Sequence, residues 1–365
     1  MKVWAGACST PTVAVAIRRP YDNFALIRLG LALAVVVSHA FSVTTGAVNG
    51  EPLVATMGFT LGETAVNGFF AVSGFLVTMS YDRRGWRDYV IARALRIAPG
   101  FVVATLVVAL MFGAALTRLP VAEYWRDPGL WRFITATLTT FKSSAALPGV
   151  FEANPFKFPM GTVWTLKYEV LCYVGVLALG LSGLLRSRMV VPVLVAALFC
   201  AVAGLDAVRP DAPKGLQTML RLPLIFFLGG LLYLWRDRVR LSTLALAGLA
   251  AATALLRDTF LYKALLFTAE SYGVLWLALM PGLSHPALDL KNDFSYGIYL
   301  YGWPAQQALH QLLPAAAALT LLGPSLVLTL AAAASSWFWV ERPALALKFR
   351  SLGRRTLKTI EPAAP

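Results

Sequence analysis

The feature that most constrains the fold is a series of apolar runs, each roughly 18–23 residues long, that recurs along the whole chain. A run of this length can cross the hydrocarbon core of a bilayer as an α-helix, because a helix makes its backbone hydrogen bonds within the segment. Hydrophobic residues make up 58% of the chain and charged residues 14%, against about 25% charged in ordinary soluble domains. The sequence therefore predicts an all-α, polytopic integral membrane bundle without a soluble domain.

About ten transmembrane spans meet the criteria of length and charge. They are expected near 24–46, 61–81, 100–116, 160–181, 190–208, 220–235, 241–256, 261–282, 294–313 and 316–340. The net charge is +14, and the basic residues gather at 82–96, 186–188 and 236–240 and after Glu341. Cytoplasmic loops carry such an excess of Lys and Arg, and an even number of spans places both termini in the cytoplasm. We interpret the charge as a topology signal and expect no nucleic acid partner.

The expected organisation is a membrane domain at 21–347 between a loose cytoplasmic tail at 1–20 and a basic cytoplasmic tail at 348–365. Residues 1–20 do not resemble a secretory signal, because Pro11 interrupts a short apolar part and two arginines follow it. In the outer connection, the Trp- and Phe-bearing stretch 128–141 is expected to lie along the membrane interface. Three scattered cysteines favour neither a disulfide framework nor a metal site.

The first expected span carries two ionisable residues, Arg28 and His39. Eleven positions at about 100° each give about 1100°, within about 20° of whole turns, so both side chains share one helix face. They lie about 16 Å apart along the axis, from a rise of about 1.5 Å per residue. Ionisable groups inside a membrane are costly and usually face a cavity or a partner. The alternative is a snorkelling arginine with a histidine that packs between helices.

Arg93 and Arg96 come just before the third expected span. Residues three apart on a helix are neighbours, and two guanidinium groups there form a fork suited to phosphate oxygens. The alternative interpretation is a plain topology anchor.

Further polar and aromatic residues fall at membrane depth or at its borders. They are Asn67, Ser73, Trp164, Glu169, Tyr299 and Glu341. Asn67 is typical either of a link between helices or of a site lining. Glu169 could pair with Lys167, with an arginine or with His39. An alternative for Glu341 is a plain surface ion pair with Arg342, which is worth about 0–1 kcal/mol.

The order of these motifs resembles that of the acyltransferase family 3 membrane proteins. The motifs are Arg28 with ten residues before His39, then NGFFAVSGFLVT, RALRIAP, GTVWTLKYEVLCY, FSYGIYLYGWP and ERP. The resemblance covers residues 22–350. It implies an enzyme of the cell inner (plasma) membrane that moves an acyl group from cytoplasmic acyl-CoA to a hydroxyl of a glycan or glycolipid, without a metal. Acetyl is the default, and succinyl or longer chains stay open.

The resemblance also assigns roles to residues. It implies phosphate binding by Arg28, Arg93 and Arg96 and catalytic roles for Arg28, His39 and Glu169. We also expect substrate contacts by Asn67, Ser73, Trp164, Tyr299 and Glu341. Two departures affect substrate contacts more than chemistry. Asn67-Gly68 stands where the family often has an acidic or aromatic residue, and Trp303 stands where histidine is common.

Transfer from a thioester to a hydroxyl needs a group that takes the hydroxyl proton, and a neutral imidazole suits that task near pH 7. We expect His39 to be this base and Glu169 to orient its ring. His39 could instead be a nucleophile that forms an acyl-imidazole.

Two other classes of function are open at this point. In a secondary transporter, His39 and Glu169 would form a proton relay. Against it, no pair of Gly/Pro-broken spans appears in corresponding halves, and the arginines suited to phosphate lie at one face only. In an export scaffold without catalysis, His39 would be replaceable.

Overall fold

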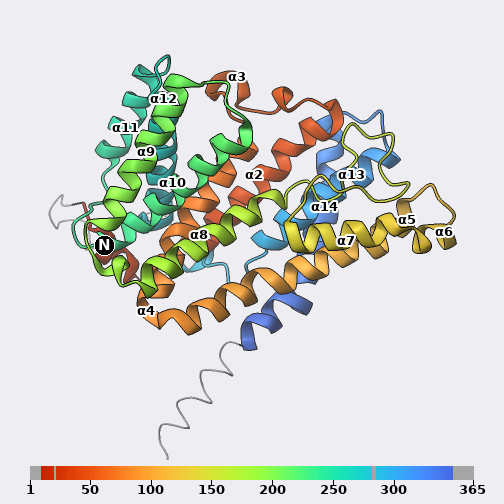
Figure 1. Ribbon diagram of the computed structural model, residues 1–365, viewed down its shortest axis with the longest axis horizontal. Helices are drawn as coiled ribbons and strands as arrows, with labels where there is room; N and C mark the ends of the chain where they lie inside the picture. The colour runs from red at the N-terminus through yellow and green to blue at the C-terminus, as the bar shows by residue number, and fades with distance from the viewer. Residues whose placement is uncertain (1–9, 20–21, 282–284, 348–365) are drawn as a thin grey trace, which may run out of the picture. The chain divides into compact units, whose positions relative to one another are not determined.

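The computed structural model describes residues 10–19, 22–281 and 285–347, and its regular elements are helical apart from one isolated bridge between Thr12 and Arg240 (Figure 1). Among the described residues, six helical segments are long and apolar enough to cross a membrane. They are Phe24–Thr45, Leu61–Leu116, Trp164–Leu181, Val190–Val208, Lys214–Leu234 and Ala318–Leu347. The all-α class is confirmed and a membrane bundle is supported, while the ten spans and the cytoplasmic termini stay predictions.

The α-helices follow the expected apolar runs closely. They are α1 (Val13–Ile17), α2 (Phe24–Thr45), α3 (Val54–Met57), α4 (Leu61–Leu106), α5 (Gly113–Leu116), α6 (Val121–Arg126), α7 (Pro128–Thr140), α8 (Trp164–Leu181), α9 (Val190–Val208), α10 (Lys214–Leu234), α11 (Thr243–Leu255), α12 (Tyr262–Leu279), α13 (Ser295–Leu312) and α14 (Ala318–Ser336). Two π-helical segments, Val107–Phe112 and Trp337–Glu341, continue α4 and α14.

The chain forms two compact units. The first unit takes the described residues of the ranges Met1–Arg28, Val66–Arg83 and Val174–Lys291. The second takes those of Leu29–Ala65, Arg84–Tyr173 and Asn292–Pro365. Helices α2, α4 and α8 contribute residues to both units.

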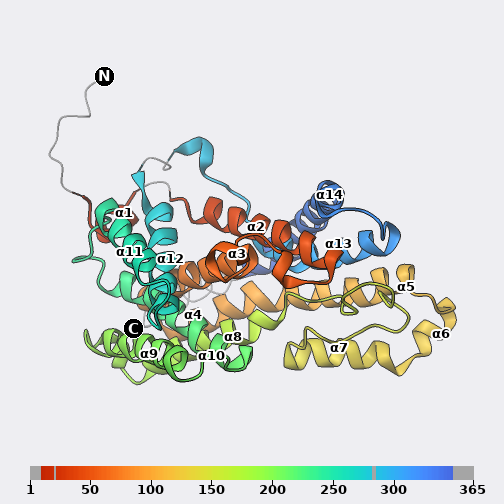
Figure 2. The ribbon, with the colours of Figure 1, turned by 90° about the horizontal axis from the view of Figure 1, so that it is seen from above.

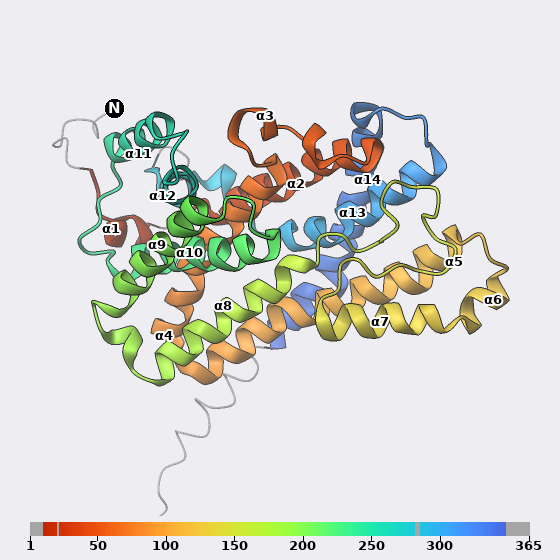
Figure 3. The same ribbon diagram turned by 45° about the horizontal axis from the view of Figure 1, so that its top comes forward.

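In the first unit α9 packs beside α10, and α11 packs beside α12 (Figure 3). Glycines let α4 and α10 approach each other at backbone distance. A Cβ added to Gly74 would lie 1.8 Å from the carbonyl oxygen of Phe226, and one added to Gly229 would lie 2.1 Å from that of Ala71. Small residues permit this closeness between membrane helices. The small residues of the second expected span thus let α4 pack tightly against α10.

The described part of the expected N-terminal tail is not loose. Residues Val13 and Ala16, three apart on α1, are buried in an apolar cluster with Tyr233. The backbone N–H of Val13 donates to the carbonyl of Val239 at 2.9 Å. Burial of the apolar side chains of VAVAI is favourable in free energy, because it removes their surface from water. Residues 1–9 and the expected tail at 348–365 lie outside the described residues.

In the second unit α13 and α14 run side by side (Figure 1). The segment 82–96, expected to be an inner loop, is helical instead: α4 runs through it, and only Gly85 leaves helical geometry, at φ 76° and ψ 173°. Arg93 and Arg96, within this segment, therefore lie on a helix. This is the condition under which positions 93 and 96 become neighbours.

Helix α7, labelled in Figure 2, has one buried and one exposed face, as expected of an interfacial helix. It begins at Pro128, where the carboxylate of Asp127 accepts a hydrogen bond from Gly129 N at 2.6 Å, and it buries Leu130 and Phe133 while Trp131 is 55% exposed. Its position at a membrane surface stays a prediction.

Candidate active site

His39 lies in the second unit, on the last third of α2. Arg28 lies on the same helix, as expected, and falls in the first unit. The side chain of His39 is 23% exposed, so the imidazole is partly covered by its surroundings.

The carboxylate beside His39 is Glu51, not Glu169. Nδ1 of the imidazole lies 3.6 Å from Oε1 of Glu51, and Glu51 is only 6% exposed. Glu51 belongs to the connection between α2 and α4, where it follows the short 3₁₀ turn Val48–Gly50 and precedes Pro52. The described contacts of His39 thus include Glu51 rather than Glu169, and the expectation that Glu169 orients the ring stays a prediction.

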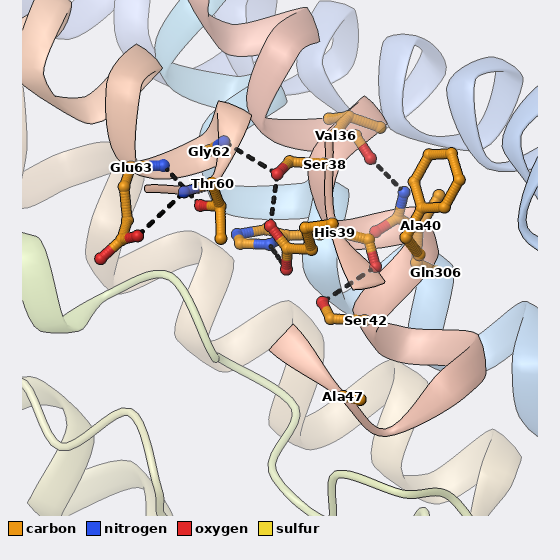
Figure 4. A network of polar contacts seen from close by, with 12 residues as sticks. Val36, Ser38, His39, Ala40, Ser42, Ala47, Thr60, Gly62, Glu63 and Gln306 are labelled. Atoms are coloured by element: carbon orange, nitrogen blue, oxygen red, sulfur yellow. Dashed lines mark hydrogen bonds and ion pairs between the residues drawn. The ribbon is translucent and has the colours of Figure 1, made fainter. Parts of the chain in front are cut away.

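A hydrogen-bond chain ties this carboxylate to the start of α4, and Figure 4 shows the link of that chain between Ser38 and Gly62. The hydroxyl of Ser38 donates to Oε2 of Glu51 and accepts from the backbone N–H of Gly62 at 2.8 Å. Gly62 lies in the first turn of α4, which Thr60 and Glu63 close with a reciprocal capping box. The N–H groups of a first helical turn have no partner within the helix, so Ser38 satisfies one of them.

Glu51 carries its negative charge at neutral pH. Burial acts to raise the pKa of its carboxyl, but contact with the imidazole of His39, its charge, and the hydroxyls of Ser38 and Ser42 outweigh burial and lower the pKa overall. Hydrogen bonds and an opposite charge favour the ionised form of a carboxyl in this way.

The aromatic ring of Trp303 contacts the same imidazole. The ring of Trp303 meets that of His39 edge to face, with centroids 5.0 Å apart and planes at 88°. Trp303 is itself fixed, because its Nε1 donates to the carbonyl of Phe158 at 2.9 Å and its ring stacks on that of Phe158. A Cβ on Gly161 would lie 2.5 Å from the Trp303 ring. The sequence had marked Trp303 only as a departure from the family motif, whereas the structure places it against the expected catalytic base.

The two arginines of the expected phosphate fork have different surroundings. Nη2 of Arg96 lies 2.6 Å from Oδ2 of Asp293, and its guanidinium lies over the ring of Tyr296 at 5.7 Å. Arg93 lies over the ring of Tyr173, at 5.6 Å from its centroid. Arg96 is thus paired with a carboxylate of the chain itself, and Arg93 lies against an aromatic ring.

Both carboxylates expected at the site lie with these arginines. Oε1 of Glu169 accepts a hydrogen bond from the hydroxyl of Tyr173, the ring under Arg93. Glu341 is 2% exposed, accepts from Ser336 at 2.9 Å, and interacts electrostatically with Arg96. Because Glu341 is buried, the alternative of a surface ion pair is wrong.

Two expected substrate contacts of the second unit have partners within the protein. Tyr299 is buried, and its hydroxyl donates to the carbonyl of Thr162 at 2.9 Å, which joins α13 to the turn before α8. Trp164 meets Tyr168 edge to face. Contacts of Tyr299 and Trp164 with a substrate stay predictions.

Two expected substrate contacts fall in the first unit. Asn67 is buried, and its Nδ2 donates to Oε2 of Glu270 at 2.7 Å, so it links α4 to α12. Ser73 lies six residues further along α4 and is partly buried. For Asn67, the interpretation as a link between helices is confirmed, and a role toward a substrate stays a prediction.

Comparison with known proteins decides the family. Residues 21–340 match the family described as an acyltransferase domain, Acyl_transf_3. The chain belongs to acyltransferase family 3. The resemblance read from the motifs is thus confirmed, and with it an O-acetyltransferase-like enzyme rather than a transporter or a scaffold. Together with the six apolar helices, this makes the protein a membrane acyltransferase.

Two relatives of this family 3 acyltransferase carry functional names. An "O-acetyl transferase" of Shigella phage Sf6 is 25% identical over 293 residues, which cover 78% of this chain and 85% of the relative. "Nodulation protein 10" of Rhizobium leguminosarum bv. viciae is 30% identical over 369 residues, 92% of this chain and 96% of the relative. No solved structure matches the chain significantly.

Proposed function

We propose that this family 3 acyltransferase moves an acyl group, acetyl in the first instance, from cytoplasmic acyl-CoA to a hydroxyl of a glycan or glycolipid, with His39 as the general base. The observation that carries the proposal is the imidazole of His39, whose Nδ1 faces the buried carboxylate of Glu51 at 3.6 Å in a membrane acyltransferase. The name of the phage Sf6 relative supports acetyl as the group transferred.

The transfer exchanges one ester bond for another. The acceptor oxygen attacks the thioester carbonyl carbon while Nε2 of His39 takes the hydroxyl proton. The C–S bond then breaks, and the proton passes to the leaving thiolate, so the products are an O-acyl ester and free CoA thiol. The imidazole ends neutral, ready for the next turnover.

The donor's phosphates need cationic partners. We assign them to Arg93 and Arg96 of the second unit, since guanidinium groups bind phosphate oxygens in bidentate fashion, and phosphate binding by Arg28 stays a prediction. Arg96 already contacts Asp293, so the larger share falls to Arg93. A position in the inner (plasma) membrane gives these arginines access to cytoplasmic CoA.

The proposal is tested by release of CoA thiol from the purified, detergent-solubilised protein. With acetyl-CoA and a panel of glycan and glycolipid acceptors, thiol release should rise with an accepted hydroxyl compound and should match the ester formed, mole for mole, by mass spectrometry. Deoxy analogues that lack the accepted hydroxyl should give neither product. Thiol release that is absent over a broad panel of donors and acceptors would overturn the proposal.

Replacing Arg93 by glutamine should raise KM for acetyl-CoA about 10–100-fold and leave kcat nearly unchanged, because a phosphate contact acts equally on bound substrate and transition state. The matched control is Arg87→Gln, an exposed arginine of the same helix over Trp86, which should leave KM unchanged. With a donor that lacks the 3′-phosphate, wild type and Arg93→Gln should differ less if Arg93 binds that group. An unchanged KM in Arg93→Gln would remove Arg93 from the donor site.

A further inference from the structure

Glu51 is a buried carboxylate that sequence reasoning did not single out. It is 6% exposed and lies 3.6 Å from Nδ1 of His39. Nδ1 is itself buried and makes no hydrogen bond within the described residues. A buried polar atom in a native protein normally has a partner. The carboxylate of Glu51 is the group placed to become that partner.

The distance is slightly longer than a hydrogen bond, as is common in sites without substrate. Catalytic hydrogen bonds are often long in the unliganded enzyme and tighten when the reacting complex forms. An imidazole that has gained a proton also attracts a carboxylate more strongly than a neutral one does. A small approach of the two groups therefore suffices to form a charged hydrogen bond.

The loop that bears Glu51 is fastened on both sides of it. The backbone N–H of Glu51 donates to the carbonyl of Val48 at 3.0 Å, and the carbonyl of Pro52 accepts from Leu61 N at 2.8 Å. The residue before a proline is biased to extended conformations, and Glu51 has φ −72° and ψ 150°. Its carboxylate is therefore held in place before any substrate arrives.

The second carboxylate oxygen is held through Ser38. The Ser38 hydroxyl donates to Oε2 of Glu51 and accepts from Gly62 N, the second residue of α4. Ser38 precedes His39 on α2. One stretch of that helix therefore supplies both the imidazole and the hydroxyl that holds the carboxylate of Glu51. Oε1 faces Nδ1.

We infer that Glu51 is the positioning residue of the transfer reaction: it holds His39 in the tautomer with the proton on Nδ1, which leaves Nε2 free to act as the base. Glu51 accepts the Nδ1–H hydrogen bond, stabilises the imidazolium after Nε2 has taken the hydroxyl proton, and stays ionised throughout. The role in catalysis rests on the proposed function, whereas the effect on the tautomer does not.

The kinetic test uses purified Glu51→Gln and Glu51→Asp with acetyl-CoA and an accepted hydroxyl compound. Glu51→Gln should lower kcat about 10²–10⁴-fold with KM for acetyl-CoA unchanged. Glu51→Asp should recover at least about tenfold of that loss, because it restores the charge at a slightly greater distance. Glu63→Gln, the same chemical change in the capping box of α4, is the matched control and should keep wild-type kcat.

A second measurement needs no activity. The chain has three histidines, so ¹⁵N-histidine labelling with long-range ¹H–¹⁵N spectra can resolve their tautomers, and the spectrum of His39→Gln identifies the His39 signals. Wild-type His39 should show a protonated Nδ1 and an unprotonated Nε2. In Glu51→Gln the proton should shift toward Nε2.

The outcomes separate the two claims. Wild-type kcat and an unchanged tautomer in Glu51→Gln overturn the positioning role and leave the proposed function standing. A loss of kcat that merely follows the amount of folded protein also overturns it. If His39→Gln keeps full activity while Glu51→Gln still shifts the tautomer, the proposed function fails and the structural pairing stands.

Discussion

Replacing His39 by glutamine is expected to lower kcat by about 10²–10⁴-fold or more while the protein stays folded. A positioned general base contributes a factor of this size, and glutamine has no group that can accept a proton near pH 7. Glutamine is close to histidine in volume, so the packing against Trp303 changes little. The measurement is thiol release at saturating acetyl-CoA and acceptor, normalised to folded protein.

The matched control for this substitution is His285→Gln, which alters an exposed histidine of the other unit. It should keep wild-type kcat and the same thermal midpoint. If His39→Gln retains more than a tenth of wild-type kcat, His39 is not the base. Rapid quenching with radiolabelled donor and no acceptor then separates the two roles of histidine: a base leaves the protein unlabelled, and a nucleophile gives an acyl-protein.

The helices were predictable because their signal is local. Length and apolar content predicted helices at 24–46 and 190–208. The structure has α2 at Phe24–Thr45 and α9 at Val190–Val208. The charged stretch 82–96 was expected to be a loop, since charge within a membrane is costly. Its arginines, alanines and leucine are nevertheless good helix formers, and only Gly85 leaves helical geometry.

The carboxylate partner of His39 was not predictable in the same way. Glu51 lies in a connection without periodicity, between Gly50 and Pro52, and its place beside the imidazole depends on hydrogen bonds from Ser38 and the first turn of α4. Glu169 looked stronger because it interrupts an apolar span. The position of His39 deep within an apolar span marked it in the sequence. The path by which the loop after α2 brings Glu51 back to His39 has no such signal.

The arginine pair shows the same limit. Helical spacing placed Arg93 and Arg96 together, and α4 bears both. The partner of Arg96 is Asp293, which lies 197 residues away in sequence. A contact over this separation depends on how α4 and the segment before α13 pack, which no local pattern reports.

Replacing Gly74 by alanine should destabilise the protein beyond about 4 kcal/mol, enough to remove most folded protein from detergent extracts. The added Cβ would lie 1.8 Å from the carbonyl oxygen of Phe226 and 2.7 Å from its carbonyl carbon, and both atoms belong to the backbone of α10. A flexible side chain could turn away, but a helix backbone moves only with the helix. Overpacking of this kind therefore costs more than the about 1–3 kcal/mol typical of crowded cores.

The controls for Gly74→Ala are Gly30→Ala on α2 and Gly248→Ala on α11, where an added Cβ meets nothing within 4 Å. Both should be neutral or stabilising by up to about 1 kcal/mol, since alanine is the better helix former. The measurements are the yield of monodisperse protein and its thermal midpoint. A Gly74→Ala protein that melts like wild type would contradict the backbone contact between α4 and α10. Any activity that remains should scale with folded protein, because Gly74 lies in the first unit and His39 in the second.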